Sequence, residues 1–337
     1  MKKKKPILQY VLFLIICILF YILFRDSLSD IWSEVCKTKG TVLLAISLAA
    51  ILYHIFEGHI TYLLAVRHQK DYTFWKGIKN SFFASFYRVA TLGSAGGLSA
   101  IYNLHLDNVP VSDGVGLYFV GYVLHKIAIL LYGVIVLILR ASWIGKNFSE
   151  YDWYFVLGYA LGILIVIGMV LICVSPLIYR IANLLLEKLK KKLPKKAEKI
   201  DELNSKLQAM QKETRLLLRD WKLIVRVILE DLVKLSTYFI IPYLILYSSH
   251  VISPWDSLSL VAIIYILAAA IPTPSGVGSI EAVYLLLSIK FMSSVEAAAS
   301  MLLFRFATMI IPFAIGGIYI MIRNFLLLYH SKHCHSE

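Results

Sequence analysis

Long apolar segments dominate the chain, separated by short polar stretches. Crossing about 30 Å of hydrocarbon at about 1.5 Å per residue takes roughly 20 apolar residues in a helix. The segments that approach or exceed this length are 7–24, 41–66, 115–139, 153–179, 223–247 and 295–328. The last of them is long enough to tilt or break. The pattern predicts an all-α polytopic membrane protein built as a helix bundle.

Two further apolar stretches are shorter and are interrupted by glycine and proline. Residues 77–106 are broken by a glycine-rich run at 92–99, and residues 256–291 are broken by Pro-Thr-Pro-Ser-Gly-Val-Gly at 272–278. Backbone without helical hydrogen bonds is tolerated at membrane depth only where it lines a cavity or the protein interior. We therefore expect two re-entrant hairpins made of half-helices.

The two breaks share a residue spacing. The shared pattern, T-x4-G-x3-A-x-Y, consists of Thr91, Gly96, Ala100 and Tyr102 in the first half and Thr273, Gly278, Ala282 and Tyr284 in the second. Flanking charge assigns the ends of the first hairpin to the inside and those of the second to the outside. Opposed hairpins with a common motif favour an inverted repeat, an architecture that places a substrate site near the midplane. Transport is the function that this pattern favours.

The distribution of lysine and arginine predicts the orientation, since cytoplasmic loops carry the positive charge. Lys2 to Lys5 and the basic segment 67–79 lie inside, whereas the neutral segments 25–40 and 140–152 fit the outside. The first apolar segment follows the lysines and has no small-residue cleavage site, so we expect a retained anchor. We predict a multi-pass protein of the cell membrane with both termini cytoplasmic.

Composition supports a membrane protein and limits its organisation. Apolar residues make up 59% and charged residues 16% of the 337 residues, against about 45–50% and about 25% in soluble domains. A large globular catalytic domain is therefore excluded. The scattered cysteines predict no disulfide framework. The net charge of +13 suggests contact with anionic lipid and not with nucleic acid.

We expect two membrane halves joined by a basic linker. The N-terminal half covers 1–179 with the re-entrant segment 77–106, and the C-terminal half covers 223–337 with the re-entrant segment 256–291. Residues 180–222 hold 13 basic and 6 acidic side chains, and their apolar residues recur at helical spacing. Such a segment is typical of an amphipathic helix on the anionic inner leaflet, the alternative being a solvated linker.

Ionisable side chains inside the apolar segments indicate candidate chemistry, because each costs at least a few kcal/mol if it is unpaired in hydrocarbon. They are His54, Glu57, His59, Arg88, His125, Lys126, Glu230, Asp231, Lys234, Glu281 and Arg305. We expect Glu230 and Lys234, four residues apart, to neutralise each other on one helix face. His54 and Glu57 have no third ligand at a suitable spacing, so we predict no metal site and no cofactor.

Glu281 and Arg305 are the strongest candidates for a site. Glu281 lies in the first turn of a half-helix, where it caps free amides or contacts a substrate. Arg305 lies deep in the last apolar segment and must meet a carboxylate, a carbonyl of the break or a substrate phosphate, for which arginine is suited. The glycine-rich half-helix starts add free N–H groups for an anion. Lys126 fits a structural ion pair or a phosphate contact equally well.

The predicted substrate-binding residues follow from these arguments. They are Arg88, Thr91, Ser94, Gly96, Gly97, Ser99, Tyr102, Lys126, Thr273, Ser275, Gly276, Gly278, Glu281 and Arg305. The chain has no Walker loop, no G-x-S-x-G and no H-E-x-x-H, so we predict no catalytic residues from motifs.

The motif Ile-Pro-Thr-Pro-Ser-Gly-Val-Gly-Ser-Ile-Glu-Ala at 271–282, the run Leu-Phe-Arg-Phe-Ala-Thr-Met-Ile-Ile-Pro at 303–312 and the glycine-rich motif at 91–102 resemble the lysylphosphatidylglycerol synthase transmembrane family. This is the flippase-like membrane part of the multiple peptide resistance factor. The resemblance implies a bundle with two opposed re-entrant elements that moves an aminoacylated phospholipid from the inner to the outer leaflet. It also implies a role in resistance to cationic antimicrobial peptides, a form of antibiotic resistance.

Three classes of function stay open at this stage. The first is a flippase or scramblase for aminoacylated phosphatidylglycerol or a related anionic phospholipid, and the second is a carrier for another anionic amphiphile such as a polyprenyl phosphate. The third is a component of phosphatidylglycerol lysyltransferase activity, an enzyme function not expected here, because the family's soluble synthase domain is missing from this chain. The expected partners are the lipid and the membrane, with a separate synthase and a second copy of the chain as further candidates.

Overall fold

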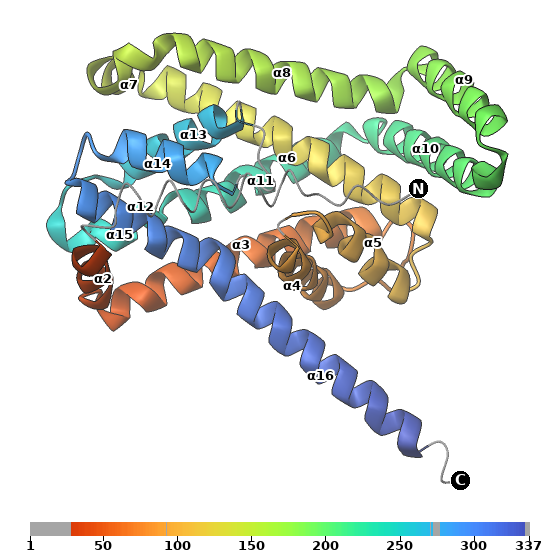
Figure 1. The fold of residues 1–337 in the computed structure, drawn as a ribbon, viewed down its shortest axis with the longest axis horizontal. Coiled ribbons are helices and arrows are strands. Elements are labelled where there is room, and N and C mark those ends of the chain that lie inside the picture. Colours follow the sequence, from red (N-terminus) through yellow and green to blue (C-terminus); the bar gives the residue numbers. More distant parts are fainter. Residues whose placement is uncertain (1–27, 92, 270, 272–276, 334–337) are drawn as a thin grey trace.

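The computed structural model describes residues 28–91, 93–269, 271 and 277–333, and over these ranges the chain contains helices and no strand (Figure 1). The α-helices are α2 (Leu28–Cys36), α3 (Gly40–Ala65), α4 (Phe74–Ala90), α5 (Gly96–Leu106), α6 (Val111–Leu139), α7 (Ala141–Phe148), α8 (Asp152–Val174), α9 (Pro176–Lys192), α10 (Ala197–Leu218), α11 (Trp221–Phe239), α12 (Ile241–Leu246), α13 (Pro254–Ala269), α14 (Ser279–Ser288), α15 (Ser294–Arg305) and α16 (Ile311–His333). The all-α class is confirmed. The predicted helix 7–24 lies outside the described residues.

Long apolar helices give the molecule its membrane character. Those among the described residues that are long and apolar enough to cross a bilayer run over Gly40–Ala65, Val111–Leu139, Ala141–Leu171 and Ser294–Phe325. The last combines α15 and α16 through a π-helical turn, Phe306–Ile310. This long segment therefore changes its helical winding at one wide turn, and such turns often occur at functional sites.

Proline shortens two of the predicted spans. The segment 223–247 was expected to be one helix, but α11 ends at Phe239 and α12 starts at Ile241. Pro242, at the start of α12, has no N–H to donate, so the helical ladder cannot continue through it. Likewise α8 ends at Val174 and does not reach residue 179, since Pro176 opens α9.

Two pairs of half-length helices lie on either side of the predicted breaks. α4 packs against α5, and α13 packs against α14. The two pairs lie toward opposite ends of the molecule's long axis (Figure 1). Gly93 and Gly278 both have φ of 93°, a left-handed conformation that glycine adopts without a steric penalty. The glycines of the two breaks therefore allow the sharp changes in chain direction.

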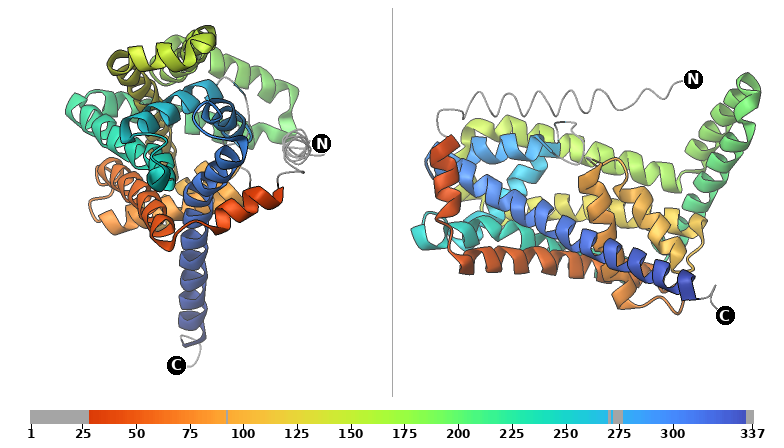
Figure 2. Two further views of the ribbon diagram at one scale, coloured as in Figure 1. Left: turned by 90° about the vertical axis from the view of Figure 1, so that its left-hand side faces the viewer. Right: turned by 60° about the horizontal axis from the view of Figure 1, so that its bottom comes forward.

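Close backbone contact fixes α4 between α3 and α16, with which it makes extensive contact (Figure 2). A Cβ atom at Gly77 would lie 2.1 Å from the carbonyl oxygen of Gly58, and one at Gly316 would lie 2.4 Å from that of Phe82. Only glycine permits such an approach at these positions. α4, which carries Arg88, is thus held by packing on two sides.

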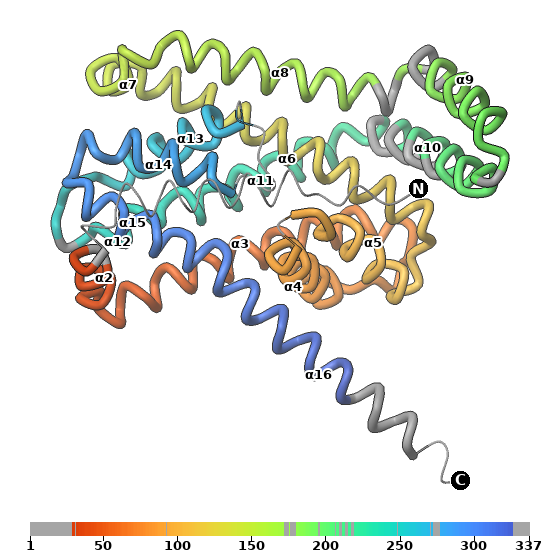
Figure 3. Tube along the Cα trace, viewed as in Figure 1, coloured from red at the N-terminus to blue at the C-terminus, as the bar shows by residue number. Residues whose placement is uncertain are grey.

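The basic segment after α8 forms a helical hairpin of α9 and α10 (Figure 3). Lys190 Nζ lies 2.7 Å from Asp201 Oδ1 and ties the two helices together. Residue Asp220 then caps α11, because the Leu223 N–H donates to its Oδ1 at 3.0 Å. That hydrogen bond and the ion pair with Arg67 lower the pKa of the Asp220 carboxyl.

Tryptophan marks the ends of several helices. Trp75, Trp153, Trp221 and Trp255 each lie in the first turn of their helix and are highly exposed. Trp143 instead stacks on Phe291, with ring centroids 5.7 Å apart. Exposed tryptophan at helix ends is typical of the interfaces of a membrane.

Candidate functional site

A cavity of about 730 Å³ lies inside the helix bundle. Its walls come from α3, α4, α5, α6, α8, α11, α13, α14 and α15, and from the π-helical turn. Residues beside both breaks reach it, among them Gly93 and Gly96 from the first and Val277 and Ser279 from the second. The two half-helix pairs, far apart in sequence, therefore contribute to one site.

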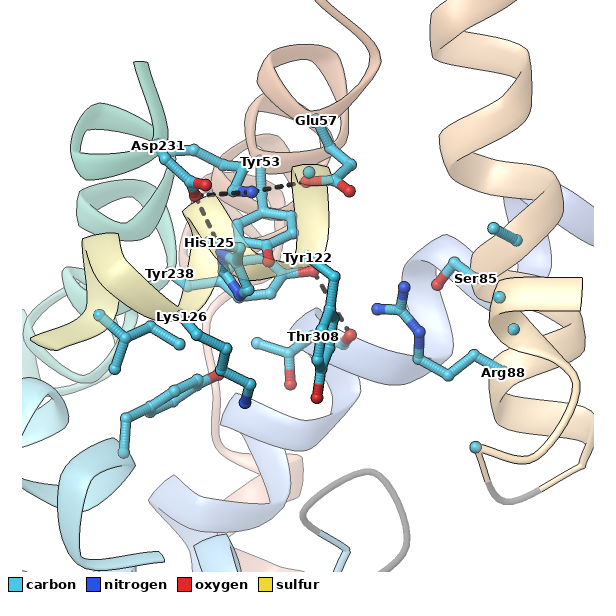
Figure 4. A pocket seen from close by; sticks show the side chains of 18 of the residues that line it. Tyr53, Glu57, Ser85, Arg88, Tyr122, His125, Lys126, Asp231, Tyr238 and Thr308 are labelled. Carbon is cyan, nitrogen blue, oxygen red and sulfur yellow. Dashed lines mark hydrogen bonds and ion pairs between the residues drawn. The ribbon is translucent and has the colours of Figure 1, made fainter. Parts of the chain in front are cut away.

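A network of charged side chains, buried at its centre, forms one wall. Lys234 Nζ lies 2.5 Å from Glu57 Oε2 and 2.7 Å from Asp231 Oδ1, and His125 Nδ1 lies 2.8 Å from the same Asp231 oxygen (Figure 4). The side chains of Asp231 and Lys234 are each only 1% exposed. Three helices, α3, α6 and α11, are joined through these contacts.

The predicted pair of Glu230 and Lys234 is wrong. Glu230 Oε2 lies 2.7 Å from His59 Nδ1, and its Oε1 accepts a hydrogen bond from Arg226 Nε at 3.1 Å. Lys234 turns to the buried face of α11, where Asp231 and Glu57 together supply two carboxylates. A deeply buried ammonium is stabilised better by those contacts than by one partly exposed carboxylate on its own helix.

Aromatic side chains pack beside this network. Tyr53 and Tyr238 stack with ring centroids 3.7 Å apart, and Lys234 Nζ lies 5.2 Å from the Tyr53 ring centroid. His54 Nδ1 lies 2.7 Å from Ser81 Oγ, so its ring is engaged with a hydroxyl and not with Glu57. Among the described residues no group of three His, Cys, Asp or Glu side chains is placed to hold a metal ion.

Arg88 and Lys126 are the cavity's uncompensated cations within the part of the chain that the structure describes. Both line the cavity, and Figure 4 shows both side chains directed into it from α4 and α6. Neither forms an ion pair with a carboxylate of the described residues. Arg88 interacts electrostatically with the Tyr118 side chain, and Lys126 Nζ lies 5.4 Å from the Tyr122 ring centroid. Neither neighbour carries the negative charge that these cations require.

Gly96 and Gly97, at the start of α5, leave room for the side chains of Arg88 and Tyr118. A Cβ atom at Gly96 would lie 3.0 Å from the Cβ of Arg88, and one at Gly97 would lie 2.7 Å from the Tyr118 ring. Larger residues would displace Arg88 and Tyr118. Their side chains lie against the start of α5, so these glycines position the cationic wall.

Arg305 and Glu281 form a pair at the second break. Arg305 donates to Glu281 Oε2 at 2.7 Å, and the same oxygen accepts from the Gly278 N–H at 2.7 Å. Of the partners considered for Arg305, the structure provides the carboxylate. Glu281 both caps α14 and offsets the charge of Arg305, which lines the cavity.

The remaining predicted site residues shape the breaks. Thr91 Oγ1 donates a hydrogen bond to the Tyr87 carbonyl and accepts one from the Ala95 N–H. The Ser94 hydroxyl donates to the Thr91 carbonyl, and the Ser99 hydroxyl donates to the Gly96 carbonyl. Tyr102 is 54% exposed and does not line the cavity. Thr273, Ser275 and Gly276 lie outside the described residues.

Comparison with known protein families identifies the family of this chain. The family model for the lysylphosphatidylglycerol synthase transmembrane region matches residues 7–316. The chain belongs to this family. The match includes both breaks and every helix that lines the cavity, and no curated protein matches the chain significantly. Membership associates this membrane protein with the handling of lysylphosphatidylglycerol.

Proposed function

We propose that this protein is a flippase or scramblase that moves phosphatidylglycerol, or its aminoacylated form, between the leaflets of the cell membrane. The observation that carries the proposal is the presence of Arg88 and Lys126, directed into the cavity without a carboxylate partner among the described residues. Family membership adds the class of lipid.

Charge explains why these two residues favour a phospholipid. An uncompensated cation at membrane depth costs at least a few kcal/mol, and two such cations near one space call for an anion. A phosphodiester supplies two acceptor oxygens, which suit the planar fork of Arg88, while Lys126 contributes a point charge. Arg305 is a weaker candidate for this role, because Glu281 already neutralises it.

The cavity's size and its acidic side fit an aminoacylated headgroup. A volume of about 730 Å³ is in the range of small-ligand pockets, so the headgroup occupies it while the acyl chains stay in the bilayer. The Glu57 side chain is 37% exposed and lines the same cavity. Its carboxylate is available to an ammonium group of a lysylated lipid.

The proposed transport function also implies a particular architecture in the membrane. In it α4 with α5 and α13 with α14 are re-entrant hairpins that enter from opposite faces, related as an inverted repeat. Both termini and the basic linker 180–222 are cytoplasmic, between membrane halves 1–179 and 223–337. Support comes from the positions of the two pairs toward opposite ends of the molecule and from the net positive charge of the linker.

Leaflet-resolved transport in proteoliposomes tests the proposal. Fluorescent phosphatidylglycerol, lysylphosphatidylglycerol and phosphatidylcholine are compared for the wild type and for Arg88→Gln, Lys126→Gln and the control Lys146→Gln, whose side chain is exposed on α7. We expect each cavity variant to slow transfer of phosphatidylglycerol about tenfold or more, the effect of losing a charged hydrogen bond. Lys146→Gln should match the wild type. Equal rates for all four proteins, or no transfer by the wild type, would contradict the proposal.

A carrier of another lipid phosphate is the second candidate, because Arg88 and Lys126 recognise the phosphate and not the tail. The same vesicles with a labelled polyprenyl phosphate separate the two, since faster transfer of that lipid than of phosphatidylglycerol would identify the carrier. The lysyltransferase alternative has its own assay, transfer of labelled lysine from lysyl-tRNA to phosphatidylglycerol by the purified protein.

A further inference from the structure

A second group of ionisable side chains lines the cavity beside Arg88 and Lys126. We call His125, Asp231, Lys234 and Glu57 the His125 cluster; all four line the cavity and are linked by contacts of 2.5–2.8 Å. Phosphate binding does not require these residues, because their cation, Lys234, is already held by two carboxylates. Their arrangement therefore needs a different explanation.

The cluster's charge depends on one proton. Two carboxylates and one ammonium leave a net charge of −1 when His125 is neutral, and zero when it is protonated. Asp231 and Glu57 favour a proton on the imidazole, whereas burial of the ring and the neighbouring Lys234 oppose it, so the cluster can take up one proton when a nearby positive charge is offset. Histidine is the side chain whose ordinary pKa, about 6.5, lies in the physiological range. The His125 side chain is 22% exposed, so a proton from water in the cavity can reach it.

The position of the proton follows from the contacts. An ionised carboxylate only accepts hydrogen bonds, so Nδ1 of His125 donates to Asp231 and the incoming proton binds at Nε2. The charged groups that act on this ring are Asp231 and Lys234 from α11, Glu57 from α3, Lys126 on its own helix, and Arg88 from α4 within the same cavity. The two carboxylates favour the imidazolium, and the cations oppose it.

A bound phosphate changes that balance. Its negative charge offsets Arg88 and Lys126, the two opposing cations that no carboxylate of the described residues neutralises, and so raises the proton affinity of His125. Linkage is reciprocal, so protonation of His125 must strengthen phosphate binding by the same factor. We propose that the His125 cluster takes up a proton when an anionic lipid headgroup binds at Arg88 and Lys126, so that lipid movement is coupled to protons. This inference rests on the function proposed above.

Binding of a soluble probe at two pH values tests the coupling. The purified full chain in uncharged detergent is titrated with dihexanoyl phosphatidylglycerol at about pH 5.5 and about pH 8, on either side of the ordinary histidine pKa; the phosphodiester is ionised at both. We expect binding about fivefold or more tighter at the lower pH, within the usual range of coupling between two sites. An indicator dye should register proton uptake as the lipid is added.

Matched histidine variants locate the proton. His125→Asn keeps an amide nitrogen near the position of Nδ1, preserving a hydrogen bond to Asp231 while removing the titration, and should abolish both the pH dependence and the uptake. His59→Asn is the control, because His59 Nδ1 contacts Glu230 at 2.7 Å and does not line this cavity. It should behave as the wild type. Glu57→Gln gives an independent test, since it leaves the cluster neutral without the proton and should also remove the uptake.

Each result decides between the two proposals. If the wild type binds the probe equally at both pH values, the coupling is overturned and the proposed function stands. If it binds at neither, both are overturned. If His125→Asn and Glu57→Gln retain the wild-type pH dependence, another group, such as His54, takes up the proton and the assignment to the His125 cluster is wrong.

Discussion

Lys234 shows how a single charge is accommodated at membrane depth. Its ammonium contacts Glu57 and Asp231 and lies near the face of the Tyr53 ring, so it is neutralised from two helices. Removal of one partner from such a buried group leaves an uncompensated charge, and the cost of that charge exceeds the net stabilisation that the intact ion pair provides. The network therefore constrains α3 and α11 as well as lining the cavity.

Substitution of Lys234 by Met should destabilise the protein strongly. We expect a loss of about 3 kcal/mol or more in the free energy of unfolding in detergent, because Asp231 and Glu57 lose their shared cation. The control is Lys37→Met, whose ion pair with Glu34 is exposed and should contribute less than about 1 kcal/mol. Adding Asp231→Asn and Glu57→Gln should recover part of the loss. Equal stability of Lys234→Met and the wild type would show that the network is not needed for folding.

At the scale of helices, glycine decides how closely neighbours approach. Glycine-rich runs predicted the breaks, and Gly93 and Gly278 fit that role with their positive φ. Gly58 and Gly77 have a different role, since they lie inside helices and let the α3 and α4 backbones come into contact. Nothing in the sequence distinguishes these from helical glycines that face open space, such as Gly168.

This difference predicts opposite effects for the same substitution. In Gly77→Ala the new Cβ would lie 2.1 Å from the Gly58 carbonyl oxygen, so α4 must shift, at a cost of about 2 kcal/mol. Gly168→Ala meets nothing within 4 Å and should be neutral or stabilising by up to about 1 kcal/mol through helix propensity. Thermal unfolding of the two purified variants measures this. Identical melting of both variants would contradict the packing argument. Because α4 carries Arg88, Gly77→Ala should also slow lipid transfer.

At the scale of the whole molecule, the proposed membrane topology depends on where the two pairs of half-length helices lie. The half-length pairs α4–α5 and α13–α14 lie toward opposite ends of the long axis, while α3, α6 and the α15–α16 helix are long enough to cross the membrane. If the long axis lies along the membrane normal, each pair enters from its own face and ends near the central cavity. Charge then assigns α4–α5 to the cytoplasmic face.

Cysteine accessibility tests this topology in a background without the native cysteines. An impermeant maleimide should label Ser112→Cys only from the cytoplasmic side, and Ser253→Cys and Ser293→Cys only from the outside. All three serines are exposed, whereas Ser300 is 1% exposed and, as Cys, should stay unlabelled until the protein is denatured. Labelling of Ser253→Cys and Ser293→Cys from opposite sides would rule out the second hairpin.

The sequence by itself determined the class of protein, most of the helices and the places where they break. These features depend on local chemistry: the hydrocarbon core requires long apolar helices, and proline and glycine interrupt the hydrogen-bond ladder wherever they occur. Apolar length alone misplaced the ends of α11 and α8, although Pro242 and Pro176 signal them. The sequence also identified every histidine and every acidic or basic side chain of the cavity, since such residues are rare in apolar segments.

Only the tertiary structure decided which of these charges neutralise one another. Lys234 is paired with Glu57, which lies 177 residues away, and not with Glu230 on its own helix. Arg305 is paired with Glu281. Arg88 and Lys126, in contrast, have no carboxylate partner among the described residues. Nothing in the sequence marked Tyr53, Tyr118 and Tyr238 as cavity residues, because tyrosine is common in membrane helices. The physical reason is that pairing depends on the rotation and depth of each helix, which packing sets, whereas local sequence sets only the presence of the charge.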